Sequence, residues 1–416
     1  MIPLLYSVYL AASHVTAPLF ALLQSKGLKN GKEDPRRAAE RWGIAGRARP
    51  DGLIVWFHAA SVGETQSLLP LISVLLDLRK DVTVLITSTT RTSAVMLTDT
   101  LQPKVVHQMA PYDTVKASRA FLRHWQPNVA IWVESELWPR MLQETGARNI
   151  PKLYLNARVS GRTARRWARF PASARFVLSS FNTINVQEKA TFDALSSIGI
   201  SGSNVELTGS LKKDRPPLVC DENELTGLRA AIGDRFVWCA ASTHSGEEEI
   251  MLAAHQSRAG LLILVPRHPN RATAIADLSV SADFKIARRS LNEAITSETQ
   301  VYIADTMGEL GLWFRLASAS FIGGSLSLAG GHNPYEAAQL GSAILHGPNV
   351  ANFASIYSDL DQAGAAREVS DVNTLGNALN LSDAKHTGMA EAAHIVLSQG
   401  TRATDTALNA ILEYLD

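Results

Sequence analysis

Cysteine is almost missing from this chain of 416 residues, which contains only Cys220 and Cys239. Neither lies in a Cys-x-x-Cys pair or beside clustered histidines, so the sequence indicates neither a disulfide framework nor a zinc site. An excess of one charge is also missing, because 40 lysines and arginines oppose 39 aspartates and glutamates. This balance does not suggest a nucleic-acid-binding protein. Walker A spacing and a GxGxxG fingerprint after the first expected strand are absent as well.

The order of apolar and polar segments predicts two α/β domains. Short apolar runs alternate with helix-length amphipathic stretches, which is the pattern of parallel sheets covered by helices. A polar, proline-bearing segment, Lys212–Pro217, interrupts this rhythm, so we place the domains at residues 51–212 and 213–416. The expected strands are Leu53–Ala59, Val82–Thr87, Val129–Val133, Lys152–Asn156, Thr183–Val186 and Val205–Gly209 in the first domain, and Phe236–Ala241, Leu261–Val265, Val301–Ala304, Ala319–Gly323 and Ala343–His346 in the second.

The segment before the first domain has an apolar part and a basic part. Residues 1–24 are apolar enough for a bilayer span, which needs about 20 residues, but Ser7, Ser13 and His14 favour a helix in the membrane interface. Lysines and arginines dominate residues 25–50, which the positive-inside tendency places on the cytoplasmic side. The alternative for this flank is a solvated, partly disordered linker.

Acidic residues follow two expected strands of the first domain. Glu64 lies where the first strand meets a helix, and Glu134 and Glu136 follow Val129–Val133. Ligands bind beyond the carboxyl ends of strands in open α/β sheets. Glu64 fits a general base, and the alternative is a glutamate that stabilises the start of its helix. Crowded carboxylates are costly unless they perform chemistry, bind a hydroxylated ligand or pair with cations.

Arginines are concentrated between positions 158 and 175, where no acidic residue occurs. They are interleaved with Trp167 and Phe170, a combination suited to a membrane surface or a phosphate-bearing lipid. The alternative is a solvated helix face that pairs with acids elsewhere. Arg158, which follows an expected strand, and the arginines after it could also pair with the acids of this domain.

In the second domain, glycine-rich turns and one arginine indicate a site for a nucleotide sugar. Arg267 follows an expected strand, where a guanidinium can bind a phosphate through two hydrogen bonds. Adjacent glycines occur at Gly323-Gly324 and Gly330-Gly331, and they let backbone amides approach an anion. Glu336 on the following helix is placed to accept hydrogen bonds from ribose hydroxyls. The alternatives are a structural salt bridge for Arg267 and two simple tight turns.

These motifs together resemble the 3-deoxy-D-manno-octulosonic acid (Kdo) transferase family of Gram-negative bacteria. The resemblance covers nearly the whole chain in order. The matching segments are His58–Glu64, Ala110–Asp113, Glu134–Pro139, Asn156–Ser160, Gly209–Lys212, Ser242–His244, Arg267–Pro269, Asp305–Leu310, Gly323–Glu336, Gly347-Pro348 and Asn352-Phe353. Residues 277–299 match nothing we can use.

The resemblance implies an inverting glycosyltransferase with the GT-B fold, in which two Rossmann-like domains face each other across a cleft. It further implies a membrane-associated N-terminal helix and a location at the cytoplasmic face of the inner membrane. The expected reaction transfers Kdo from CMP-Kdo to a lipid A precursor, lipid IVA, in lipopolysaccharide core biosynthesis. Neither a metal nor a cofactor is expected.

The same resemblance assigns roles to individual residues. Glu64 is the expected base, and Glu134 and Glu136 support acceptor placement or catalysis. The residues expected to contact the acceptor are Ser61, Gly63, Arg158, Arg162, Arg165 and Arg166. The expected donor-binding residues are Lys212, Ser242, Arg267, His268, Pro269, Met307, Gly308, Glu309, Gly323, Gly324, Ser325, Asn333 and Glu336.

Two other functions remain open from the sequence. One is a GT-B lipid glycosyltransferase that uses a UDP-sugar donor, which donor competition would distinguish. The other is a non-catalytic membrane lipid-binding protein, for which loss of Glu64 or Arg267 would be the distinguishing feature. Both residues are present.

Overall fold

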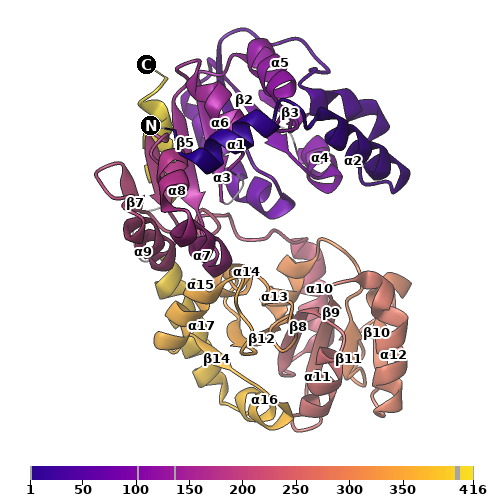
Figure 1. Cartoon of the computed structure of the whole chain (residues 1–416). Coiled ribbons are helices and arrows are strands. Elements are labelled where there is room, and N and C mark those ends of the chain that lie inside the picture. Colours follow the sequence, from indigo (N-terminus) through magenta and orange to yellow (C-terminus); the bar gives the residue numbers. More distant parts are fainter. Residues whose placement is uncertain (1, 101–102, 135–136, 399–402, 416) are drawn as a thin grey trace. The chain divides into compact units, whose positions relative to one another are not determined.

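The computed structural model describes residues 2–100, 103–134, 137–398 and 403–415 and divides into two compact units (Figure 1). The first unit contains Met1–Arg215 together with Gly400–Asp416, and the second contains Pro216–Gln399. Each unit has its own seven-stranded sheet with parallel strand pairs. The two-domain α/β architecture expected from the sequence is therefore present.

The first unit has the strand order β3-β2-β1-β4-β5-β6-β7. This order reverses direction between β1 and β4, as in Rossmann-type sheets, so the carboxyl ends of these two strands mark the expected ligand position. The strands are β1 (Leu53–His58), β2 (Val82–Ser88), β3 (Val105–Met109), β4 (Val129–Val133), β5 (Lys152–Ala157), β6 (Thr183–Val186) and β7 (Val205–Leu207). The helices are α1 (Leu4–Ala12), α2 (Ala17–Lys29), η1 (Pro35–Trp42), α3 (Val62–Leu78), α4 (Arg91–Thr100), α5 (Val115–Trp125), α6 (Pro139–Gly146), α7 (Gly161–Arg169), α8 (Pro171–Leu178), α9 (Lys189–Ser197) and α18 (Ala403–Leu412).

Both faces of this sheet are buried, which explains why its central strands are continuously apolar. Val55 and Phe57 of β1 belong to the core on one face, whereas Ile54 and Trp56 belong to the core on the other. Neighbouring residues of a strand point to opposite faces, so a single apolar run supplies both cores.

The last helix corrects the domain limits expected from the sequence. Helix α18 packs against α3 of the first unit, and Ala407, Leu408 and Ile411 join the core that contains Leu68 and Leu71. The prediction that the second domain extends to residue 416 was therefore wrong for this helix. An apolar face near the end of a chain does not reveal which sheet it covers.

The N-terminal segment is built into the first unit. Pro18 lies in the first turn of α2, where proline favours the start of a helix, so two helices replace the expected single one. Within the described residues no single helix is long and apolar enough to cross a bilayer, although α1 and α2, bent by 64°, pass that test of length and composition as a pair. In the basic flank, Arg37 pairs with Glu40 and the buried Arg41 pairs with Glu33, so these residues are ordered rather than a solvated linker.

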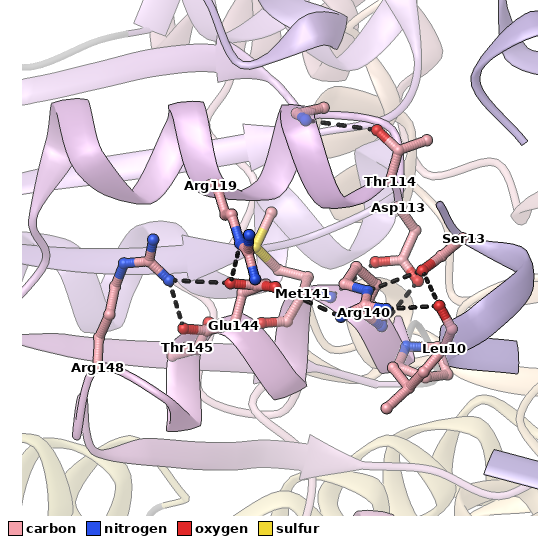
Figure 2. A network of polar contacts seen from close by, with 12 residues as sticks. Leu10, Ser13, Asp113, Thr114, Arg119, Arg140, Met141, Glu144, Thr145 and Arg148 are labelled. Carbon is pink, nitrogen blue, oxygen red and sulfur yellow. Dashed lines mark hydrogen bonds and ion pairs between the residues drawn. The ribbon is translucent and has the colours of Figure 1, made fainter. Parts of the chain in front are cut away.

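A buried polar network attaches α1 to α6 (Figure 2). The Asp113 carboxylate accepts hydrogen bonds from the Tyr9 hydroxyl at 2.7 Å and from the Met141 amide at 2.7 Å. The Arg140 guanidinium donates to the Ser13 hydroxyl at 2.7 Å and pairs with Glu144 at 3.4 Å. Buried polar groups are costly when they lack partners, so these contacts fix α1 in one place on the unit.

The second unit repeats the architecture with the strand order β10-β11-β9-β8-β12-β13-β14. Strands β9 to β11 lie on one side of β8 in the sheet, and β12 to β14 lie on the other. The strands are β8 (Val237–Thr243), β9 (Leu261–Pro266), β10 (Ile286–Arg288), β11 (Val301–Ile303), β12 (Ala319–Ile322), β13 (Ala343–His346) and β14 (Ala366–Glu368). The helices are α10 (Glu222–Ile232), α11 (Glu247–His255), η2 (Pro269–Arg271), α12 (Ala272–Ser281), η3 (Arg289–Leu291), α13 (Leu310–Leu316), α14 (Tyr335–Gln339), α15 (Ala354–Gln362), α16 (Val372–Leu379) and α17 (Asp383–Ser398). The adjacent carboxyl ends of β8 and β12 mark the ligand position in this sheet.

Candidate active site

In the first unit, the turn between β1 and α3 brings the Glu64 carboxylate back over its own backbone. Ser61 caps the helix by accepting a hydrogen bond from the Glu64 amide at 3.3 Å. The Glu64 carboxylate accepts from the Ala60 amide at 2.7 Å and from the Ser61 hydroxyl at 3.2 Å. Glu64 is thus placed by a capping-box type of contact, which fixes its position at the end of β1. The helix-start role is present, and it does not exclude a catalytic one.

Gly63 leaves open space at the start of α3. It is exposed, and a Cβ atom placed on it would have no heavy atom within 4 Å apart from its chain neighbours. A ligand can therefore approach the start of α3 at Gly63 without meeting a side chain.

At the end of the neighbouring strand β4, Glu134 has a strained backbone conformation, and its carboxylate has two polar partners. Its φ of 56° lies in the left-handed region, as does the 52° of Asn156 at the end of β5. Such conformations cost about 1–3 kcal/mol each in residues other than glycine and are concentrated at functional sites. The buried Glu134 carboxylate pairs with the Lys212 ammonium at 2.6 Å and accepts from the Asn156 amide at 3.3 Å.

Lys212, which we expected to contact the donor, therefore contacts Glu134 of the first unit. The Leu211 amide donates to the Asn156 side chain at 3.1 Å, so this segment is attached to the end of β5. Glu136, the third expected catalytic acid, lies outside the described residues.

The arginines expected to bind the acceptor occupy two settings. Arg158 is half-buried and lies 4.0 Å from Glu188. Arg162, Arg165 and Arg166 are exposed on α7, and within the described part of the chain their guanidinium groups form no ion pair with a carboxylate.

In the second unit, the ends of β8 and β12 are in direct contact. A Cβ atom on Gly323 would lie 2.4 Å from the Ser242 carbonyl oxygen, so only glycine fits at that position. Gly324 follows with a φ of 70°, and Ser242 itself has a φ of 58°. The Ser325 hydroxyl accepts a hydrogen bond from the Gly347 amide at 2.8 Å, which connects this turn to the end of β13.

A glutamate that sequence reasoning missed holds these two turns together. Glu247, at the start of α11, is only 1% exposed. Its carboxylate accepts from the His244 amide at 2.8 Å, the Gly324 amide at 2.8 Å and the Leu326 amide at 2.9 Å. The signal was in the sequence, because Gly246-Glu247 repeats the Gly63-Glu64 pair of the first domain after the corresponding strand.

Basic side chains surround these turns. Nε2 of His244 lies 2.8 Å from Nε2 of His332, and their rings stack with centroids 5.1 Å apart. Burial, together with the nearby charges of His244, Arg267 and His268, lowers the pKa of His332 to about 4. The Arg267 backbone amide donates to Thr243 at 3.0 Å, and its side chain is exposed. A neutral His332 next to a cationic arginine is a suitable setting for a phosphate.

The remaining expected donor residues are distributed over neighbouring turns. His268 is exposed and Pro269 opens η2, while Met307 is 72% exposed beside Gly308, whose φ is 87°. Asn333 accepts from the Tyr335 amide at 3.0 Å, and Glu336 is half-buried in the first turn of α14.

Glu309 has a protein partner of its own. Its carboxylate pairs with Arg289 at 2.5 Å. Burial would raise the pKa of Glu309, but hydrogen bonds from Arg289 and Thr306 outweigh burial and lower it.

In the part of the chain that the structure describes, no group of three or more histidine, cysteine, aspartate or glutamate side chains is suited to bind a metal ion.

Two Rossmann-type units of this kind occur in glycosyltransferases and in sugar-nucleotide epimerases. The structure of MurG from Acinetobacter baumannii matches with a TM-score of 0.55 and 13% identity over 87% of this chain and 100% of that one. The UDP-GlcNAc 2-epimerase from Neisseria meningitidis bound to UDP-GlcNAc matches with a TM-score of 0.58 and 14% identity over 87% of this chain and 99% of that one. These similarities define a GT-B-like fold and no more than the fold.

Sequence relatives identify the family. The 3-deoxy-D-manno-octulosonic acid transferase of Rickettsia bellii is 32% identical over 89% of this chain and 89% of its own length. The transferase of the same name from Haemophilus influenzae is 33% identical over 92% of both chains. Residues 36–215 match the family model described as 3-deoxy-D-manno-octulosonic-acid transferase (kdotransferase). The chain belongs to the 3-deoxy-D-manno-octulosonic acid transferase family.

Proposed function

We propose that this Kdo transferase takes Kdo from CMP-Kdo and attaches it to a hydroxyl of a lipid A precursor such as lipid IVA. Family membership carries the transferase activity. The observation that supports the site is the placement of Glu64 at the end of β1, where the strand order reverses and Gly63 leaves the surface open.

In the proposed reaction, the Glu64 carboxylate takes the proton of the acceptor hydroxyl. The acceptor oxygen attacks the anomeric carbon of Kdo, a new carbon–oxygen bond forms, and the bond from that carbon to the phosphate oxygen breaks. The CMP phosphate leaves with the electron pair, and the anomeric configuration is inverted. A positioned base of this kind contributes typically about 10²–10⁴-fold in rate.

Glu134 and Lys212 have a positioning role in this proposal. Their ion pair, together with Asn156, holds the ends of β4 and β5 and the segment at Leu211 in one arrangement next to β1. A fixed polar surface is worth more to a reaction than a mobile one, because it needs no reorganisation as charge develops.

The second unit binds the CMP part of the donor. The phosphate contacts Arg267 and the backbone amides of the Gly323–Ser325 turn, while Glu336 and Asn333 bind the nucleoside. The phosphate gains charge as its bond to Kdo breaks, so a guanidinium and preorganised amides stabilise the transition state. Glu247 supports this surface because it fixes the Gly324 and Leu326 amides.

We further propose that the protein acts at the cytoplasmic face of the inner membrane. Large apolar side chains are exposed on both N-terminal helices, for example Leu4 at 81% and Leu22 at 70%. Many exposed apolar side chains within one short segment are a mark of a membrane or protein contact. Flotation with vesicles of phosphatidylglycerol and phosphatidylethanolamine tests this placement, and a protein that stays at the bottom of the gradient at low salt argues against it.

The proposed reaction is tested by incubating the purified chain with CMP-Kdo and a tetra-acylated lipid A precursor, followed by mass spectrometry. The expected products are CMP and a lipid heavier by one or more Kdo units. Transfer from a UDP-sugar in the same assay, with no consumption of CMP-Kdo, would contradict the proposed donor.

A further inference from the structure

An apolar cavity of about 350 Å³ lies within the first unit, between α1, α7 and α8. Leu5 and Tyr6 of α1 form one wall, and Trp167, Phe170 and Val177 form another. The cavity belongs to one compact unit, and its lining comes from segments that are far apart in the sequence. Helix α1 therefore forms part of the cavity wall as well as part of the fold.

The hydroxyls of the two tyrosines in this lining already form hydrogen bonds within the protein. The Tyr6 hydroxyl donates to the Pro139 carbonyl at 2.9 Å, and the Tyr9 hydroxyl donates to Asp113 at 2.7 Å. Their rings are left to line the cavity with leucine, valine and alanine side chains. A cavity with this lining favours hydrocarbon over water.

The cavity also has a cationic edge. Arg166 is the one charged side chain among the described residues that line it. Arg162, Arg165 and Arg169 are exposed on the same helix, and no carboxylate forms an ion pair with them in the described ranges. Arginines without acidic partners, next to an apolar cavity, are complementary to a molecule that joins a hydrocarbon chain to a phosphate.

We propose that this cavity receives one acyl chain of the acceptor lipid, while Arg166 contacts a phosphate of its headgroup. The inference rests on the proposed function, because that function supplies an acceptor with acyl chains and phosphates. The volume holds on the order of ten water-sized groups at about 30 Å³ each, which suits a single chain segment and not a whole lipid.

The wall formed by α1 is fixed before any lipid binds. Asp113 holds this helix through Tyr9. Arg140 holds it through Ser13 and the Leu10 carbonyl (Figure 2). A preformed pocket loses little conformational entropy on binding, so it can select a chain by length and position. A helix that simply inserts into the bilayer makes no such selection.

Filling the cavity tests the proposal. Ser173 lines it, whereas the neighbouring Ala172 on the same helix is exposed and does not. We expect Ser173→Trp to raise the ratio of the KM for the tetra-acylated acceptor to the KM for the deacylated, doubly phosphorylated disaccharide by at least about tenfold. Ala172→Trp, the matched control, should keep the wild-type ratio. A wild-type ratio in a folded Ser173→Trp protein would overturn the proposal.

A cross-linking measurement on the wild-type chain does not depend on a folded variant or on turnover. The probe is a single-chain lipid phosphate whose acyl chain ends in a diazirine. The expected cross-links lie in α1, α7 and α8, and unlabelled lipid A precursor should compete with them better than phosphatidylglycerol vesicles do. Cross-links outside these helices, or equal competition by phosphatidylglycerol, would overturn the assignment to the acceptor.

The two proposals fail in different ways. If the wild-type chain transfers no Kdo while the expected cross-links form and lipid A precursor competes with them, the proposed acceptor chemistry fails and the cavity remains a site for an acylated phosphate. If Kdo is transferred but the Ser173→Trp ratio is that of the wild type, the proposed function stands and the acyl site fails.

Discussion

The two units place a Gly-Glu pair at the same point of their sheets, but the two glutamates make different contacts. Glu64 accepts hydrogen bonds from Ala60 and Ser61 of its own turn. Glu247 instead accepts three backbone amides, two of which belong to the turn after β12. The same local pattern thus serves a carboxylate that we propose as the catalytic base in one unit and a carboxylate that holds backbone turns together in the other.

The largest expected effect concerns the first of these glutamates. Glu64→Gln should lower the turnover number for Kdo transfer by about 10²–10⁴-fold, because an amide cannot take the acceptor proton. CMP affinity, measured by calorimetry, should stay at the wild-type value, since the substitution leaves the second unit untouched. A fall in CMP affinity as large as the fall in rate would contradict the assignment of the base to the first unit and of CMP binding to the second.

The next effect concerns the arginines of α7 in the first unit. Replacing Arg162, Arg165, Arg166 and Arg169 with glutamine should weaken binding to anionic vesicles, since each basic residue near such a surface contributes about 1 kcal/mol. The KM for the lipid acceptor should rise, and CMP affinity should not change. Unaltered vesicle binding at low salt would exclude α7 as a membrane contact.

A smaller effect is expected from the donor contacts of the second unit. Arg267→Ala should weaken CMP binding by about 10–100-fold, because a hydrogen bond to a charged group contributes about 1.5–3 kcal/mol. Glu336→Ala should weaken it less, through the loss of a ribose contact. Calorimetry checks both variants, and unchanged CMP affinity in both would mean that the second unit is not the donor unit.

The smallest effect concerns the second glutamate. Glu247→Gln places an NH₂ group against backbone amides that need an acceptor, which should cost about 1–3 kcal/mol of stability and weaken CMP binding. Thermal unfolding and calorimetry measure the two changes. Glu248→Gln is a useful comparison, because Glu248 is equally buried but pairs with Arg271 instead of the turns.

The sequence predicted the interior of both sheets well, but it predicted only one of their four edge strands, β7. Central strands such as β4 and β9 are continuously apolar because they are buried on both faces, which makes them easy to find. The edge strands β10 and β14 have three residues each, and β3 is interrupted by His107 and Gln108, so none of the three stood out. Short or polar edge strands carry little periodic signal.

The candidate site was also predictable in part. Residues at the ends of β1, β4, β8 and β12 follow from the rule that ligands bind beyond the carboxyl ends of strands. The attachment of α1 to Asp113 and Arg140 was not predictable, because it joins residues more than 100 positions apart and carries no local signal. The Lys212–Glu134 pair was missed because it too joins distant parts of the chain and carries no local signal.

The most direct test is the single-turnover rate of Kdo transfer at saturating CMP-Kdo and acceptor, measured side by side for Glu64→Gln and Glu247→Gln. Saturation removes differences in donor affinity and leaves the chemical step. We expect Glu64→Gln to be slower than the wild type by at least about 10²-fold and Glu247→Gln to be slowed much less, because it loosens the turn amides without removing the base. A wild-type rate in a well-folded Glu64→Gln protein would contradict the assignment of Glu64 as the base.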